Sequence, residues 1–134
     1  MNPESLGVYI SGKMLGSGVY TANSFSKSFN YCDSSTSNNY ASLLLCDVAL
    51  GNPSKRLGAD YYITKEKLLK EKGHSAWGLG KTRPTSSVKI EKYITVPNGK
   101  MGPSGDNGTL LYDEFVVYDT NQISLKYLVI VKKC

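Results

Sequence analysis

The apolar residues of this chain fall into short segments with strand-like patterns, and this limits the folds open to it. Residues 41–50 form an apolar run that is interrupted by Asp47 and followed by a Gly-Asn-Pro turn, which is typical of a buried strand. Residues 110–118 and 123–131 alternate between apolar and polar side chains and are separated by four polar residues. That spacing predicts that the last two segments pair as an antiparallel hairpin.

One short helix is predicted near the beginning of the chain, over residues 24–30. Asn23 or Ser24 can cap its first turn with a side-chain oxygen. Phe25 and Phe29 are four residues apart, so they lie on one helical face.

Four polar or aromatic side chains near these elements suggest a binding site. Tyr20 follows a glycine-rich turn, and Ser28 and Tyr31 are three residues apart, so they can approach one ligand from a common side of the helix. Far downstream, Glu114 places a carboxylate in an otherwise apolar segment. Two aromatic faces, a hydroxyl and a carboxylate suit a flat heteroaromatic amide attached to a ribose, which is the nicotinamide end of NAD.

The neighbouring carboxylates Asp113 and Glu114 are not expected to work as a pair. Alternate residues of a strand face opposite sides, so Glu114 shares a face with Tyr112 and Val116, while Asp113 lies on the other face. A two-carboxylate hydrolase mechanism is therefore excluded. On strand pattern alone, Glu114 also fits an ordinary surface carboxylate, and both tyrosines fit a half-buried core.

The composition and charge of the chain argue against several classes of protein and of binding site. The 134 residues carry a formal charge of +5, but the basic residues are dispersed, so direct DNA binding is not supported by this chain. Three cysteines and one histidine have no spacing for a disulfide or a metal site, and no metal is expected. The sequence has no signal-peptide pattern and no apolar run of membrane-spanning length, so we expect an intracellular protein with no membrane contact.

Four blocks of the sequence, in order, resemble the catalytic domain of the poly(ADP-ribose) polymerases. They are GSGVYTANSFSKSFNYC, LLLCDVALGN, GHSAWGLGKTRP and TLLYDEFVVYDTNQISLKYLV, and together they extend over nearly the whole chain from Gly16 onward. The resemblance implies an α+β fold of the ADP-ribosyltransferase type, with antiparallel sheets and short helices. It identifies residues 1–134 as a partial catalytic domain that corresponds to the C-terminal portion of that fold.

The resemblance also implies a function and a set of site residues. The expected activity is transfer of ADP-ribose from NAD+, a co-substrate, to acceptor proteins or to a growing poly(ADP-ribose) chain, with release of nicotinamide. Glu114 matches the catalytic glutamate, and Tyr20 and Tyr31 match the aromatic walls of the nicotinamide pocket. Ser28 matches the donor to the carboxamide oxygen, and Lys27 matches a lysine close to the glutamate. By the same resemblance, a nuclear location and a role in DNA repair are expected.

One part of the family pattern has no counterpart in this sequence. The family uses a histidine-glycine pair on an earlier strand to contact the adenosine ribose and the nicotinamide amide. His74 lies in a loop and does not match that position. We therefore expect the first part of the fold to be missing, and an unpaired apolar strand edge to be exposed in its absence. The chain is then a fragment, a truncated gene product, or half of a split domain whose complementary chain supplies the missing part. The alternative function is that of a catalytically inactive binding or scaffold module.

Overall fold

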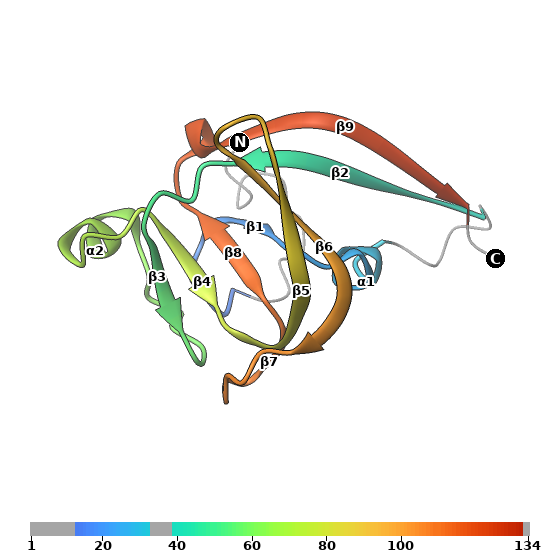
Figure 1. Ribbon diagram of the computed structural model, residues 1–134. Helices are drawn as coiled ribbons and strands as arrows, with labels where there is room; N and C mark the ends of the chain where they lie inside the picture. Colours follow the sequence, from blue (N-terminus) through green and yellow to red (C-terminus); the bar gives the residue numbers. More distant parts are fainter. Residues whose placement is uncertain (1–12, 33–38, 133–134) are drawn as a thin grey trace.

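The computed structural model describes residues 13–32 and 39–132, and it consists mainly of three small β-sheets with two short helices (Figure 1). Sheet one contains four strands, in the spatial order β1 (Val19–Thr21), β8 (Glu114–Val117), β4 (Ser75–Gly78) and β3 (Pro53–Arg56). Sheet two is a ribbon of two long strands, β2 (Tyr40–Val48) and β9 (Ile123–Lys132). Sheet three has the order β6 (Ile94–Pro103), β5 (Gly80–Ile90) and β7 (Leu110–Tyr112).

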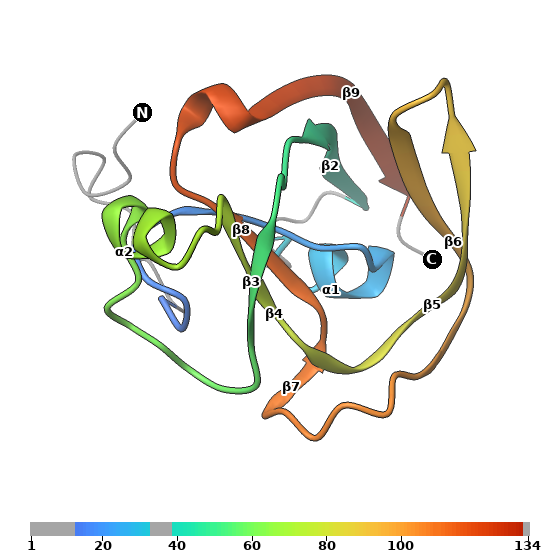
Figure 2. The same cartoon turned by 60° about the vertical axis from the view of Figure 1, so that its left-hand side comes forward.

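Most strand pairs are antiparallel, and the exceptions are β3 with β4 and β5 with β7, which run parallel. Few helices accompany the sheets: α1 (Phe25–Phe29), α2 (Lys65–Lys70) and the 3₁₀ turn η2 (Thr120–Gln122). The expected α+β class with antiparallel sheets and short helices is therefore confirmed. Figure 2 separates the layers, with the β5–β6 hairpin on one side and α2 on the other.

The hydrophobic core lies between the four-stranded sheet and α2. Leu15, Ile63, Leu68 and Val116 are almost completely buried there, and the partly buried rings of Tyr20 and Tyr118 pack against them. Leu68 comes from α2, whose first turn is capped by the hydroxyl of Thr64, which accepts from the amide of Lys67 at 3.1 Å. The core thus fixes β8 and the loop before β1 relative to each other.

The predicted helix is confirmed as α1. Its N-cap is Ser24, whose hydroxyl accepts a hydrogen bond from the amide of Lys27 at 3.3 Å. Phe25 and Phe29 stack on one face with ring centroids 5.5 Å apart, as their spacing predicts.

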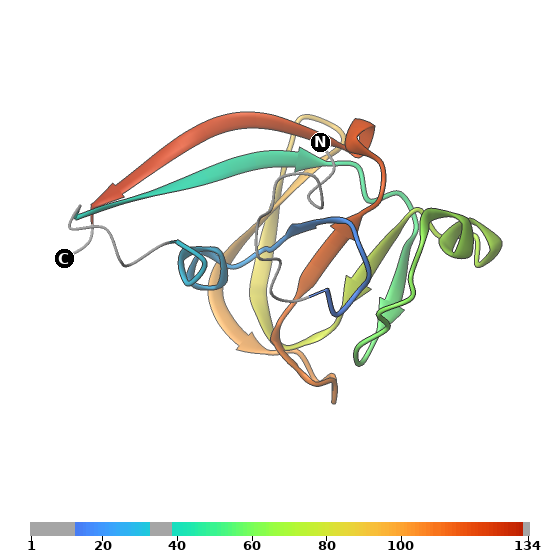
Figure 3. The same ribbon diagram turned by 180° about the vertical axis from the view of Figure 1, so that it is seen from behind.

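The predicted hairpin between the last two segments is wrong. β8 lies between β1 and β4 in the four-stranded sheet, whereas β9 pairs with β2, about eighty residues earlier (Figure 3). Val116 and Val117 are both fully buried, so β8 is covered on both faces and takes a central place in its sheet. Asp119 then caps η2 by accepting from the amide of Asn121, and the chain turns into a different sheet.

The prediction of a buried strand at residues 41–50 is only partly correct. Ala41 is buried, but Leu44 and Leu45 are 60% and 55% exposed on β2. An apolar run can be buried only where another layer covers it, and the described residues provide such a layer for only part of this ribbon.

Candidate functional site

Glu114 is a nearly buried carboxylate at the first position of β8. It lies opposite Gly78 of β4, and the residue is only 8% exposed. Lys27 reaches it from α1, with its Nζ 2.8 Å from Oε1 of the glutamate. The second oxygen, Oε2, is buried and has no hydrogen-bond partner among the described residues. A buried carboxylate oxygen without a partner is costly, so it is a good position for a ligand hydroxyl to donate a hydrogen bond.

Two contacts hold the side chain of Lys27 in place, one with Glu114 and one with the backbone of Tyr112. Besides the ion pair, its Nζ donates a hydrogen bond to the backbone oxygen of Tyr112 at 3.3 Å. The side chains of Lys27 and Glu114 are 12% and 11% exposed, so water screens their attraction less than at an exposed pair. The structure therefore brings together Glu114 and Lys27, two residues that are 87 positions apart.

Neighbouring side chains pack directly against Gly78, beside Glu114, because this glycine has no side chain. A Cβ at Gly78 would lie 2.6 Å from the side chain of Leu110 and 3.6 Å from the Cβ of Glu114. Strand β4 can therefore approach the carboxylate closely. Packing alone therefore accounts for the glycine at position 78.

Tyr20 lies next to the site but uses its hydroxyl within the protein. The hydroxyl accepts from the amide of Leu15 at 2.9 Å and donates to the oxygen of Gly16 at 2.8 Å. Burial is the main reason that the pKa of Tyr20 is raised, and the negative charge of Glu114 contributes in the same direction. These contacts give the ring a structural role, and its role as a wall of a nicotinamide pocket stays a prediction.

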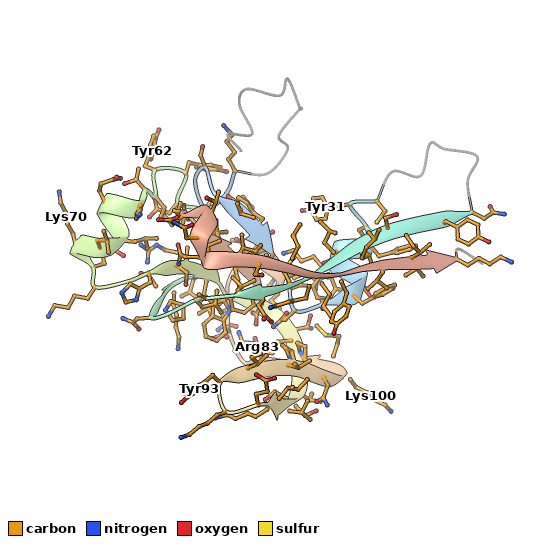
Figure 4. The ribbon with its side chains drawn as sticks, turned by 90° about the horizontal axis from the view of Figure 1, so that it is seen from above. Tyr31, Tyr62, Lys70, Arg83, Tyr93 and Lys100 are labelled. Carbon is orange, nitrogen blue, oxygen red and sulfur yellow. The ribbon has the colours of Figure 1, made fainter. Side chains whose placement is uncertain are left out.

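Ser28 and Tyr31 occupy the end of α1 as expected. Ser28 is half-buried, one residue after Lys27, while Tyr31 is 71% exposed just beyond the helix (Figure 4). An exposed ring can stack on a planar ligand without first breaking internal contacts. Their proposed contacts with a ligand stay predictions.

Asp113 takes different partners from Glu114 and has a structural role that the sequence did not indicate. It is fully buried, accepts from the amide of Gly80 at 2.7 Å and forms an ion pair with Nε of Arg83 at 3.1 Å. Asn23 donates at 3.3 Å to Oδ2, the carboxylate oxygen that also pairs with Nε of Arg83. The aspartate breaks the predicted strand into β7 and β8 and fastens their junction to the start of β5. Its place in an apolar segment was the one signal that it is buried.

His74 is a loop residue away from this carboxylate site. Its Nδ1 accepts a hydrogen bond from the amide of Asn52 at 3.0 Å, and its backbone amide donates to the oxygen of the same residue at 2.9 Å. Within residues 13–32 and 39–132, no group of three or more histidine, cysteine, aspartate or glutamate side chains is arranged to hold a metal ion. No helix in that part of the chain is long and apolar enough to cross a membrane.

Comparison with known proteins places this chain in a family. The family model described as the poly(ADP-ribose) polymerase catalytic domain matches residues 4–133. The chain is 42% identical to poly [ADP-ribose] polymerase 2 of Arabidopsis thaliana over 126 residues, which is 92% of this chain and 19% of the relative. It is also 42% identical to poly [ADP-ribose] polymerase 1 of Gallus gallus over 92% of this chain and 12% of the relative.

Poly [ADP-ribose] polymerase 2 of Homo sapiens is again 42% identical, over 89% of this chain and 21% of the relative. The chain therefore spans about an eighth to a fifth of the length of the relatives named here.

Proposed function

Since the chain belongs to the poly(ADP-ribose) polymerase catalytic-domain family, we propose that it carries the catalytic carboxylate of an NAD+-dependent ADP-ribosyltransferase. The single observation that carries this proposal is the state of Glu114. One of its oxygens is held by Lys27 at 2.8 Å, and the other is buried without a partner. A carboxylate fixed in this way is available to a hydroxyl of the substrate.

The proposed chemistry depends on charge that develops during the reaction. Breaking the bond between nicotinamide and ribose builds positive charge on the sugar, and a fixed carboxylate stabilises that charge more in the transition state than in the substrate. Glu114 would also polarise the incoming acceptor group. Lys27 holds the carboxylate in one position, so that little reorganisation is needed as the charge develops.

The remaining site residues are proposed to bind the nicotinamide ring. Tyr20 and Tyr31 would stack on its two faces, and the hydroxyl of Ser28 would donate to the carboxamide oxygen. The acceptor would be a protein or a growing poly(ADP-ribose) chain. A glutamate at position 114 favours polymer formation, because family members limited to single transfers often replace it. A nuclear location and a part in DNA repair belong to the same proposal.

A second candidate is a catalytically inactive binding or scaffold module. The observation behind it is that His74, the sole histidine in the given sequence, lies in a loop where its Nδ1 accepts a hydrogen bond from the amide of Asn52 in the turn before β3. In the catalytic proposal, a complementary chain would contribute the family histidine and the first part of the fold, with residues 1–134 acting as a partial catalytic domain.

The two candidates are separated by measuring transfer and ligand binding on the same protein. We expect the wild-type chain to transfer labelled ADP-ribose from NAD+, alone or after addition of the complementary part of the fold. Glu114→Gln should lower that rate at least about 100-fold. The affinity for a benzamide, which mimics nicotinamide, should stay unchanged, because the carboxylate acts on ribose charge.

Glu66→Gln on the surface of α2 is the matched control and should leave both quantities unchanged. Equal transfer rates for wild type and Glu114→Gln would refute the catalytic role of Glu114. Benzamide binding without any transfer, even after the complementary part is added, would favour the binding module.

A further inference from the structure

We propose that Arg83 is a positioning residue for the candidate catalytic carboxylate of Glu114. This inference rests on the proposed function, because it concerns what keeps that carboxylate in a reactive position. Arg83 acts through the two residues that flank Glu114 in the sequence, Asp113 and Phe115.

Arg83 holds the residue before Glu114 directly. Its Nε lies 3.1 Å from Oδ2 of Asp113, and its Nη2 donates a hydrogen bond to Oδ1 at 3.1 Å. Asp113 is fully buried and the side chain of Arg83 is 26% exposed, so water screens this pair less than it would an exposed one. Because the guanidinium is planar and reaches both oxygens, it fixes the position and the orientation of the aspartate where the chain enters β8.

Arg83 also supports the residue after Glu114, through the ring of Trp77. The guanidinium carbon lies 5.1 Å from the centre of that ring, which is a cation–π distance. Trp77 is opposite Phe115 in the pairing of β4 with β8, and the two rings stack with their centroids 5.4 Å apart. Phe115 points to the opposite face of β8 from Glu114, so these rings support the strand from behind the carboxylate.

Arg83 is itself held by a second carboxylate. Its Nη2 lies 2.5 Å from Oδ2 of Asp106. The amide of Asp106 donates to the hydroxyl of Ser104 at 3.1 Å, and that hydroxyl donates to the oxygen of Gly80 at 2.6 Å. Figure 4 shows Arg83 on the side of the β5–β6 hairpin that faces the rest of the molecule. A side chain with two carboxylates and a ring in fixed places has little freedom, as a positioning residue requires.

A carboxylate stays in one position only if its oxygens and its backbone are both held. Lys27 holds one oxygen of Glu114 from the side of α1, whereas Arg83 holds the backbone segment that carries the side chain. A displacement of about 1 Å can lower a rate about 100-fold, even when the altered residue lies away from the reacting atoms. Loss of Arg83 should therefore slow the reaction and leave the nicotinamide pocket intact.

This role is tested by steady-state transfer kinetics of Arg83→Met, using the full chain alone or with the complementary part of the fold. We expect kcat to fall at least about tenfold, while the KM for NAD+ and the affinity for a benzamide change less than about twofold. Arg83→Lys keeps the charge but not the planar fork, so its kcat should lie between the two. An unchanged kcat, or a loss of kcat matched by an equal loss of benzamide affinity, would overturn the proposal.

Arg56→Met is the matched control. The side chain of Arg56 is 19% exposed and also joins two carboxylates, those of Asp60 and Glu71. It lies on β3, the edge strand that β4 separates from β8. At a temperature where circular dichroism shows both variants folded, its kcat should stay within about twofold of wild type. An equal fall of kcat in both variants would contradict a specific role for Arg83.

A second measurement does not depend on activity. The coupling between Lys27 and Glu114 is obtained from the unfolding of Lys27→Met, Glu114→Gln and the double variant, with Arg83 present and in the Arg83→Met background. The coupling constant should fall at least about threefold in that background, because a mobile carboxylate meets Lys27 for only part of the time. In the Arg56→Met background it should not change.

The failure of this inference can be told apart from the failure of the proposed function. An unchanged coupling constant in the Arg83→Met background refutes the positioning role, whether or not the chain transfers ADP-ribose. Equal transfer rates for wild type and Glu114→Gln refute the catalytic proposal instead, and the coupling constant then still decides whether Arg83 holds Glu114.

Discussion

The buried aspartate beside the candidate catalytic glutamate offers the sharpest test of how this fold is held together. We predict that Asp113→Asn destabilises the protein. Asp113 is fully buried, and its carboxylate forms an ion pair with Arg83 at 3.1 Å and accepts from the amide of Gly80 at 2.7 Å. Asparagine has nearly the same shape, so the change removes the charge without opening a cavity.

The expected loss of stability depends on which contacts Arg83 and Gly80 keep in the Asp113→Asn variant. Breaking a buried ion pair by removing one charge costs about 3–5 kcal/mol. Here Arg83 is 26% exposed and keeps Asp106 at 2.5 Å, so its charge is not left without a partner. The amide of Gly80 can still donate to the asparagine oxygen. We therefore expect a loss of about 2 kcal/mol, which for a chain of this length lowers the melting temperature by roughly 8 °C.

Urea unfolding followed by circular dichroism measures this loss directly. Asp106→Asn is the matched control: it removes the more exposed partner of Arg83 and should cost less than about 1 kcal/mol. A double-mutant cycle with Arg83→Met isolates the pair, and its coupling energy should be about 1–2 kcal/mol. An Asp113→Asn protein with wild-type stability, or a cycle without coupling, would refute the structural role of this network.

Two further predictions concern a ring and a surface ion pair. Tyr31→Ala should weaken benzamide binding by about 1 kcal/mol, roughly fivefold. Its melting temperature should stay unchanged, because the ring is exposed. If calorimetry gives an unchanged dissociation constant, Tyr31 is not part of the pocket. The pKa of Asp60 lies below its usual 3.8 because Lys67, and secondarily Arg56, bond to the carboxylate. A lowered folded-state pKa gives stability that is complete above the unfolded value and is lost as the pH falls through the folded value. Asp60→Asn should therefore flatten the loss of stability below about pH 4 in urea titrations, and parallel pH curves for variant and wild type would contradict this assignment.

The sequence was sufficient where a local signal determines the structure. Ser24 caps α1, and the spacing of Phe25 and Phe29 correctly places both rings on one helical face. These features depend on residues within one or two turns of each other, so no knowledge of the rest of the chain is needed. The family resemblance was also carried by contiguous blocks.

The sequence alone did not predict which strands pair with each other, because that depends on contacts between distant segments of the chain. The short connection between residues 118 and 123 favoured a hairpin, but β8 is buried on both faces, so it belongs in the middle of a sheet and leaves β9 to pair with β2. Strand alternation correctly gave Asp113 and Glu114 different surroundings. It could not identify Arg83 or Lys27 as their partners, because those contacts join segments 30 and 87 residues apart.

The central position of β8 explains how a single sheet can place the candidate carboxylate. β1 and β4 flank β8, and Glu114 occupies its first residue, where the strand emerges from the junction held by Asp113. β1 leads directly into α1, so the same pairing that positions the glutamate also delivers Lys27 to it. The ribbon of β2 and β9 is a separate sheet, and its strand β2 contacts α1, the helix that carries Lys27.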